Sequence, residues 1–140
     1  FIRIEWNLLP WADFIAKEKE KHHFSSVTYF FAVSIILLAL FETDLAFAAI
    51  SIAIVGDGFA ACIGMKWGAK HVPWNKHKSW KGMYAYVIAA IVASSFFVPI
   101  GIGIPMAVIA GLTESMCEHI DDNFLIPLLT GFVGFALSLL

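Results

Sequence analysis

The stretch GMYAYVIAAIVASSFFVPIGIGIPMAVIAGLT, from Gly82 to Thr113, decides the fold class because it contains no charged residue. As one helix it would measure about 48 Å at about 1.5 Å per residue, whereas the apolar core of a bilayer is about 30 Å thick. Pro99, Gly101, Gly103 and Pro105 lie in its middle, where they favour a break. The stretch therefore predicts two membrane-spanning helices joined by a tight turn.

The composition of the whole chain agrees with a membrane protein. Its 140 residues are 60% hydrophobic and 14% charged, with a mean hydropathy of +0.81, whereas soluble domains carry about 45–50% apolar and about 25% charged residues. A disordered chain is excluded, and a chain this short has too little interior to bury so much apolar surface as a soluble globule. The formal net charge of −2 offers no basic surface to nucleic acid.

We expect an all-α, polytopic membrane protein with about five spans in one transmembrane catalytic domain, residues 24–140. The predicted spans are residues 24–41, 45–65, 82–98, 105–119 and 124–140. Residues 1–23 are apolar early and carry a Lys-Glu-Lys-Glu-Lys run late, which favours an amphipathic helix at the membrane interface, with a solvated charged connector as the equal alternative for residues 17–23. Because the chain opens without methionine and closes on an apolar run, we expect a C-terminal fragment of a longer membrane protein.

The basic residues predict how the spans are oriented. They precede the first predicted span or lie in the loop 66–81, whereas residues 42–44 carry no basic residue. Counting the crossings then places every Lys and Arg on one side of the bilayer. The positive-inside rule makes that side, and with it the loop 66–81, cytoplasmic.

Asp57 lies inside the second predicted span. An ionisable residue within a span is costly and is a functional candidate for that reason. Around it Gly56, Ala60, Gly64 and Gly68 repeat every four residues and leave one helix face nearly bare. Such a face is typical of close helix packing, which is our interpretation of Gly64 and Gly68. Packing does not explain a carboxylate, so we expect Asp57 to be functional.

The fourth predicted span carries a second acidic group, which continues just beyond its end. Glu114, Glu118 and Asp121 or Asp122 line one face if that helix continues through about His119 and beyond. Neighbouring carboxylates repel one another unless a cation or protons lie between them, and such hard oxygen ligands suit Mg²⁺. A solvated helix end is the alternative for Glu118 and Asp121.

The loop before the third span supplies cations. Lys78-Ser79-Trp80-Lys81-Gly82 sets two ammonium groups, a hydroxyl and a glycine at the start of a helix, whose backbone amides favour phosphate. The lysines could equally anchor the topology or touch anionic lipid headgroups. By topology the loop and both acidic groups meet on one side of the membrane. Carboxylates for a metal that face cations for phosphates are typical of phosphoryl transfer.

In this order the motifs resemble the CTP-dependent lipid kinases (dolichol kinase, phytol kinase and a diacylglycerol kinase), which belong to the phosphatidate cytidylyltransferase superfamily. The resemblance covers roughly residues 25–140 and rests on Gly56-Asp57 with Ala60, Gly64 and Gly68, on Lys78-Ser79 with Gly82, and on Glu114 and Asp122-Asn123 with Ile126-Pro127. It implies that Asp57 and Asp122 serve a metal–nucleotide site, that Lys78 and Ser79 contact the CTP phosphates, and that Asn123 completes the acidic motif.

The predicted function is therefore phosphorylation of a lipid alcohol by CTP, with Mg²⁺ as cofactor, at the cytoplasmic interface of an integral membrane protein. Either Glu114 or Asp57 would accept the hydroxyl proton. The full prediction has catalytic residues Asp57, Glu114 and Asp122; nucleotide-binding residues Lys78, Ser79, Lys81, Gly82 and Asn123; and metal ligands Asp57, Glu118, Asp121 and Asp122.

Three other functions fit the sequence less well. A CDP-lipid synthase would use nearly the same residues, but the synthases have a Lys-Arg pair and a Pro-Gly-His-Gly-Gly run where this chain has Lys66-Trp67 and Lys78–Gly82. A secondary transporter would have broken helices repeated in two halves, which are not seen. A purely structural subunit leaves the acidic residues unexplained. The expected partners are a membrane lipid and CTP, without nucleic acid; the lipid's identity and a homodimer stay open.

Overall fold

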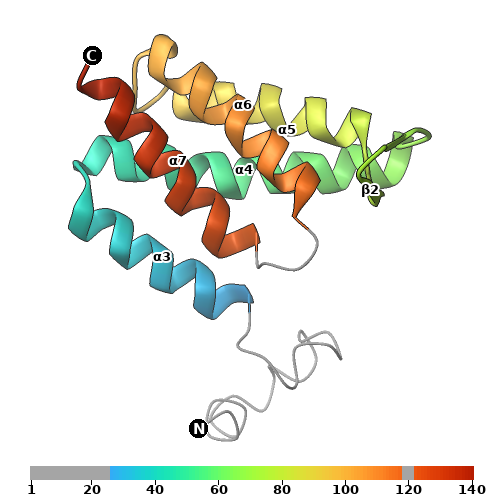
Figure 1. Cartoon of the computed structure of the whole chain (residues 1–140), viewed down its shortest axis with the longest axis horizontal. Coiled ribbons are helices and arrows are strands. Elements are labelled where there is room, and N and C mark those ends of the chain that lie inside the picture. Colours follow the sequence, from blue (N-terminus) through green and yellow to red (C-terminus); the bar gives the residue numbers. More distant parts are fainter. Residues whose placement is uncertain (1–25, 118–121) are drawn as a thin grey trace, which may run out of the picture.

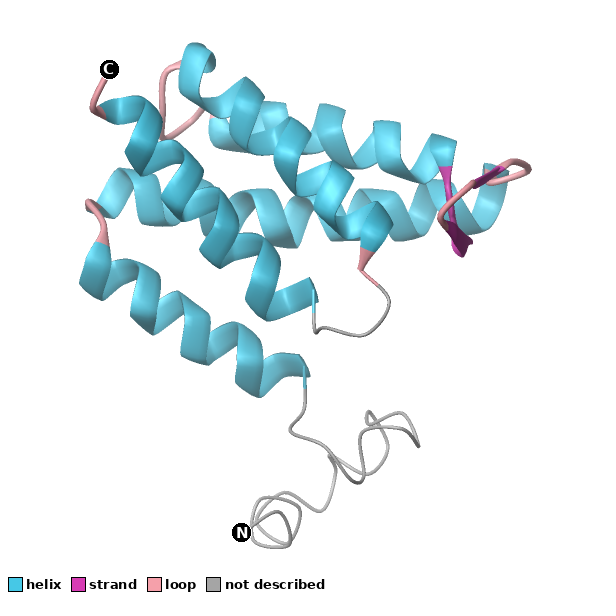
Figure 2. Cartoon of the chain, viewed as in Figure 1, coloured by secondary structure: helices cyan, strands magenta, loops and turns pink. Residues whose placement is uncertain are grey.

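The computed structural model describes residues 26–117 and 122–140, which form five helices and one short β-hairpin (Figure 1). In chain order these are α3 (Ser26–Leu40), α4 (Thr43–Trp67), β1 (His71–Val72), β2 (Asn75–Ser79), α5 (Trp80–Ser94), α6 (Ile100–Met116) and α7 (Asp122–Ser138). The chain is mostly helical, as expected (Figure 2). The predicted interfacial segment, residues 1–23, lies outside the described residues, as do Glu118 and Asp121.

The helices form a bundle whose connections lie at two opposite ends. α4 packs along α5, α5 against α6, and α6 against α7, while α7 also contacts α4 and α3. The α3–α4 and α5–α6 connections and the C-terminus share one end (Figure 1). The β-hairpin, the end of α6 and the start of α7 lie toward the other, which we call the hairpin end. The topology thus brings segments far apart in the sequence to one place.

Small residues hold α4 against α5. A Cβ atom added to Gly82 would lie 3.2 Å from the Ala60 carbonyl oxygen and 3.4 Å from the Gly64 Cα, so the two backbones approach closely. A Cβ atom at Gly64 or Gly68 would likewise meet the Ser79 side chain. The predicted packing role is clearest at Gly68, where a Cβ atom would lie 2.7 Å from the Ser79 Oγ, whereas at Gly64 it would make an ordinary contact at 3.5 Å.

The predicted turn between the third and fourth helices is misplaced. α5 ends at Ser94 and α6 begins at Ile100, so the connection covers residues 95–99 and Pro99 caps α6. Pro105 lies inside α6, where it removes one backbone hydrogen bond. Met106, Ala107 and Ala110 follow it and are fully buried, so their packing offsets that loss.

The predicted end of the fourth helix is also wrong. α6 ends at Met116, with Cys117 as its C-cap, and does not reach His119. The acidic residue Asp122 instead stands in the first turn of α7. A carboxylate is favourable there because the N-terminus of a helix carries a partial positive charge.

The segment between α4 and α5 is a β-hairpin rather than an unstructured loop. The side-chain oxygen of Asn75 accepts a hydrogen bond from the His77 backbone N–H at 2.9 Å, and both Val72 and Asn75 are buried. The Trp74 indole N–H donates to the Ser115 hydroxyl at 3.2 Å and so ties the hairpin to α6. These contacts fix the position of β2 relative to the end of α6.

Of the helices that the structure describes, α4 is long and apolar enough to cross a membrane. Its 25 residues measure about 37 Å, whereas the other helices have 15–17 residues and measure about 23–26 Å against a bilayer core of about 30 Å. Large apolar side chains face outward on every helix, among them Phe31, Ile54, Ile88, Val108 and Phe132. The topology of five spans stays a prediction.

Candidate active site

Five predicted site residues gather toward the hairpin end of the bundle. Lys78 lies on β2, Glu114 in the last turn of α6, and Asp122 and Asn123 in the first turn of α7. Asp57 lies on α4, ten residues before that helix ends at Trp67, and its negative charge helps to raise the pKa of Lys78. Three separate elements, β2, α6 and α7, therefore bring the Glu114 and Asp122 carboxylates to the Lys78 ammonium, and Asp57 of α4 is connected to them through the cavity that it lines with Asn123.

Lys78 and Glu114 form the centre of this cluster. The Lys78 ammonium donates a hydrogen bond to Glu114 Oε1 and lies 3.9 Å from Asp122 Oδ2. The Glu114 side chain is only 4% exposed, whereas those of Lys78 and Asp122 are 29% and 33% exposed. Glu114 is thus a buried carboxylate whose charge is balanced by a cation that solvent can reach.

The charge of Lys78 is set by two opposing effects. Burial lowers the pKa of Lys78, but the hydrogen bond to Glu114 and the negative charges of Glu114, Asp122 and Asp57 raise it. The second effect is larger, so the pKa of Lys78 lies above its usual value. Lys78 is therefore a cation at neutral pH.

Asp57 and Asn123 line a cavity of about 250 Å³ beside this ion pair. The other walls are apolar and include Val27 and Phe30 of α3. The Asn123 side-chain amide donates to Asp122 Oδ1 at 3.2 Å, which connects the cavity wall to the ion-pair cluster. The cavity therefore offers a carboxylate and an amide at one side and apolar surface at the other.

Three residues predicted to bind phosphate lie at the start of α5. The Ser79 hydroxyl accepts a hydrogen bond from the Gly82 backbone N–H at 3.1 Å, so it caps α5, and Ser79 is buried against α4. Gly82 provides room for the close approach of α4, and Lys81 is exposed. Ser79 and Gly82 thus have structural roles. A phosphate contact by any of the three stays a prediction.

The donor set fits Mg²⁺ only if a substrate completes its coordination. Within residues 26–117 and 122–140, no three His, Cys, Asp or Glu side chains are grouped to hold a metal ion by themselves. Mg²⁺ usually binds one or two carboxylates together with waters and substrate phosphates. The carboxylates of Asp57 and Asp122 are exposed or partly exposed hard oxygen donors and fit that arrangement. The roles of Glu118 and Asp121 as metal ligands stay predictions.

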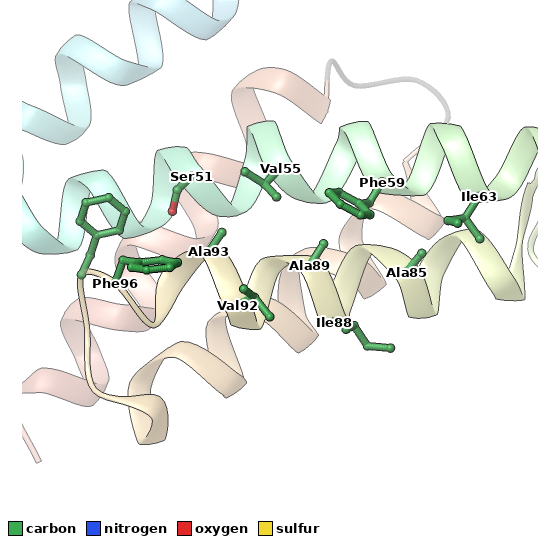
Figure 3. A pocket seen from close by; sticks show the side chains of 11 residues that line it. Ser51, Val55, Phe59, Ile63, Ala85, Ile88, Ala89, Val92, Ala93 and Phe96 are labelled. Atoms are coloured by element: carbon green, nitrogen blue, oxygen red, sulfur yellow. The ribbon is translucent and has the colours of Figure 1, made fainter.

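A second, larger cavity lies between α4 and α5 and has a volume of about 590 Å³ (Figure 3). Its lining is apolar apart from Ser51, and the described residues around it include no charged side chain. Val55 and Phe59 line it and lie two positions from Asp57, which puts them on the opposite side of α4. We therefore assign the candidate active site to the hairpin end rather than to this apolar cavity.

Sequence reasoning missed Tyr86. This residue of α5 is fully buried, and its hydroxyl has no hydrogen-bond partner among the residues that the structure describes. A Cβ atom at Gly56 would lie 2.5 Å from Cε1 and Cζ of the Tyr86 ring, so the glycine before Asp57 makes room for this ring. A tyrosine within an apolar span is a signal that could have identified it, because a buried hydroxyl needs a partner.

Comparison with known proteins yields several kinases. No family model and no solved structure matches the chain. "Probable phytol kinase, chloroplastic" of Triticum aestivum is 30% identical over 128 residues, which are 78% of this chain and 43% of that protein. "Phytol kinase" of Synechocystis sp. is 28% identical over 134 residues, 86% of this chain and 57% of that protein. "Farnesol kinase, chloroplastic" of Arabidopsis thaliana is 29% identical over 112 residues, 69% of this chain and 36% of that protein.

The chain is a relative of the phytol and farnesol kinases. This finding confirms the resemblance to lipid kinases that the motifs indicated. The chain matches 57% of the length of the Synechocystis kinase and 36% of the length of the Arabidopsis kinase, so it spans roughly a third to a little over half of these relatives. The cluster around Lys78 and Glu114 thus belongs to a chain related to enzymes named for phosphorylating isoprenoid alcohols.

Proposed function

We propose that this relative of the phytol kinases transfers the γ-phosphate of CTP to the hydroxyl group of an isoprenoid alcohol. The observation that carries the proposal is the cluster of Lys78, Glu114, Asp122 and Asp57, in which a partly exposed cation lies among carboxylates. Catalysis of phosphoryl transfer depends mainly on positioning and on charge stabilisation, and these residue types supply both. The related phytol and farnesol kinases support an isoprenoid alcohol as the acceptor.

The cavity beside Asp57 supports an amphiphilic acceptor. Its polar side, with Asp57 and Asn123, suits a hydroxyl group, and its apolar walls at Val27 and Phe30 suit a hydrocarbon chain. Ligand sites commonly combine mostly apolar walls with a few polar groups that fix orientation. We propose that the alcohol hydroxyl lies there and that Asp57 accepts its proton, with Glu114 as the other carboxylate within the cluster.

The nucleotide would approach from the solvent-accessible side of Lys78. In the reaction the alcohol oxygen forms a bond to the γ-phosphorus, and the bond from that phosphorus to the bridging oxygen of CDP breaks. The alcohol proton passes to the carboxylate and then to solvent. Lys78 offsets negative charge on the phosphate oxygens, and Mg²⁺ held by Asp122 would neutralise more of it, which leaves Asp57 to accept the proton. The choice of CTP rests on the family resemblance.

We also propose that the bundle lies in a membrane with the hairpin end at the cytoplasmic surface. The outward-facing apolar side chains on all helices support this placement, because such surface is costly in water. Cysteines at Thr43 and Lys76, both exposed and at opposite ends of the bundle, test it. An impermeant thiol reagent added outside sealed cells should label Thr43→Cys and spare Lys76→Cys, and the reverse labelling would refute the orientation.

Assays with purified protein in lipid vesicles test the reaction. Labelled CTP or ATP is supplied with Mg²⁺ and with phytol, farnesol, dolichol or diacylglycerol, and the products are separated. Formation of an isoprenoid phosphate together with CDP supports the proposal. Pyrophosphate and a CDP-lipid made from phosphatidic acid would instead show a synthase. Absence of any lipid product with every acceptor would refute both.

A further inference from the structure

The proposed role of Lys78 creates a difficulty for Glu114. Glu114 is buried, and in the described structure its carboxylate is paired with the Lys78 ammonium. A nucleotide that binds Lys78 competes for the same cation. A buried carboxylate that loses its partner is strongly destabilising, because neither water nor another charge compensates it. The Lys78 ammonium has three N–H donors and can be shared with a phosphate, but its charge is then shared as well, so a second hydrogen-bond donor would stabilise the buried Glu114 carboxylate.

The Tyr86 ring packs against α6 at Gly111, about one turn before Glu114. The ring is wedged between α4 and α6, since a Cβ atom would lie 2.5 Å from Tyr86 Cζ if added to Gly56 and 3.5 Å from Tyr86 Cδ1 if added to Gly111. Glu114 follows Gly111 by three residues, so both are on the α6 face that Tyr86 contacts. Of the nearby carboxylates, Glu114 acts most strongly on the Tyr86 hydroxyl.

The Tyr86 hydroxyl is also available to donate a hydrogen bond. Tyr86 is fully buried, and the described part of the chain provides its O–H group with no hydrogen-bond partner. Buried polar groups are rarely left in this condition, because the group has lost its hydrogen bonds to water and gained none. The Tyr86 hydroxyl, a donor without a partner, therefore lies near the buried Glu114 carboxylate. Glu114 in turn shares its partner, Lys78, with the proposed nucleotide.

We propose that Tyr86 is a positioning residue whose hydroxyl donates a hydrogen bond to Glu114 when Lys78 binds the nucleotide phosphates. The inference rests on the proposed function, because it takes Lys78 as the phosphate ligand. The exchange breaks the Lys78–Glu114 hydrogen bond and forms one from Tyr86 to Glu114, and no proton is transferred. Tyr86 would thus act on nucleotide affinity and not directly on the lipid alcohol.

Nucleotide binding to the purified protein with Mg²⁺, measured by calorimetry, tests the inference. Tyr86→Phe should weaken CTP binding roughly ten- to hundredfold, which is the effect of losing a hydrogen bond to a charged group. The matched control is Tyr84→Phe, which changes an exposed tyrosine of the same helix and should leave binding unchanged. The unfolding temperature of the nucleotide-free Tyr86→Phe protein should not fall, because its hydroxyl makes no hydrogen bond in that state.

A second background separates positioning from a structural role. In Glu114→Gln the neutral side chain no longer needs a replacement for Lys78, so adding Tyr86→Phe should change CTP affinity by less than twofold. Equal losses in both backgrounds, or a Tyr86→Phe protein that binds CTP as the wild type does, would overturn the inference alone. A wild-type protein that binds no nucleotide would instead refute the proposed function.

Discussion

Replacing Lys78 by methionine should destabilise the protein strongly. The substitution keeps much of the side-chain length but removes the cation that balances Glu114, whose side chain is 4% exposed. Removing one partner of a buried ion pair costs about 3–5 kcal/mol. The lower value applies here because the Lys78 end of the pair is 29% exposed and water can reach it. We therefore expect a loss of about 3 kcal/mol in the free energy of unfolding.

Thermal unfolding of the purified protein in detergent measures this effect. For a chain of this size a loss of about 3 kcal/mol lowers the unfolding temperature by roughly 10 °C. The double substitution Lys78→Met with Glu114→Gln removes both charges and should recover more than half of that loss, since no unpaired carboxylate remains buried. An unfolding temperature of Lys78→Met within about 2 °C of the wild-type value would refute the reasoning. A double variant no more stable than Lys78→Met would refute it as well.

Other substitutions and a pH titration test the remaining features. Asp57→Asn should abolish phosphoryl transfer while leaving the unfolding temperature unchanged, and substantial turnover at saturating Mg²⁺ would contradict the assignment. Gly56→Ala should lower the free energy of unfolding by about 1–3 kcal/mol, because the added Cβ overpacks against Tyr86. Gly58→Ala, whose added Cβ has nothing within 4 Å, should instead raise it by about 0.5–1 kcal/mol. Similar melting temperatures for the two variants would be inconsistent with close packing at Gly56. Because folding raises the pKa of Lys78, its contribution to stability is complete below its ordinary pKa of 10.5 and is lost as the pH rises through the folded value. Chemical denaturation of wild type between pH 9 and 12, compared with the uncharged double variant, should show a steeper fall for wild type, and parallel curves would count against the shift.

The helices were predictable because their signal is local. Each of the five predicted apolar stretches overlaps one observed helix, and the spacing of Gly64 and Gly68 predicted how α4 approaches α5. The errors occur where tertiary contacts outweigh local preference. The helix α6 continues through Pro105 because the buried residues that follow it pack well. The hairpin forms because the side chains of Trp74 and Asn75 make hydrogen bonds that no local sequence pattern reveals.

The residues that meet at the hairpin end were named from the sequence, but their pairing was not, and their roles in binding and catalysis stay predictions. Lys78 and Glu114 are 36 positions apart in the sequence, and nothing in either motif shows that their side chains meet. The pairing of Lys78 with Asp122 depends on the chain leaving α6 at Met116 and entering α7 beside the hairpin. A tyrosine within an apolar span could have drawn attention to Tyr86, but only the packed structure shows that its hydroxyl has no hydrogen-bond partner among the described residues.

Several residues toward the hairpin end lower the stability of the fold, which argues that this end is a functional site. Replacing a buried ion pair by apolar residues of similar volume is often neutral or stabilising, so the Lys78–Glu114 pair is not required to hold helices together. The unpartnered Tyr86 hydroxyl lowers stability relative to phenylalanine, and a carboxylate at Asp57 is costly on an apolar helix. Three features that each lower stability are connected within one cluster, and a packing role explains none of them. Binding of a charged substrate explains all three, because phosphate needs a cation, a metal ion that accompanies phosphate needs carboxylates, and the Tyr86 hydroxyl then has an acceptor in Glu114.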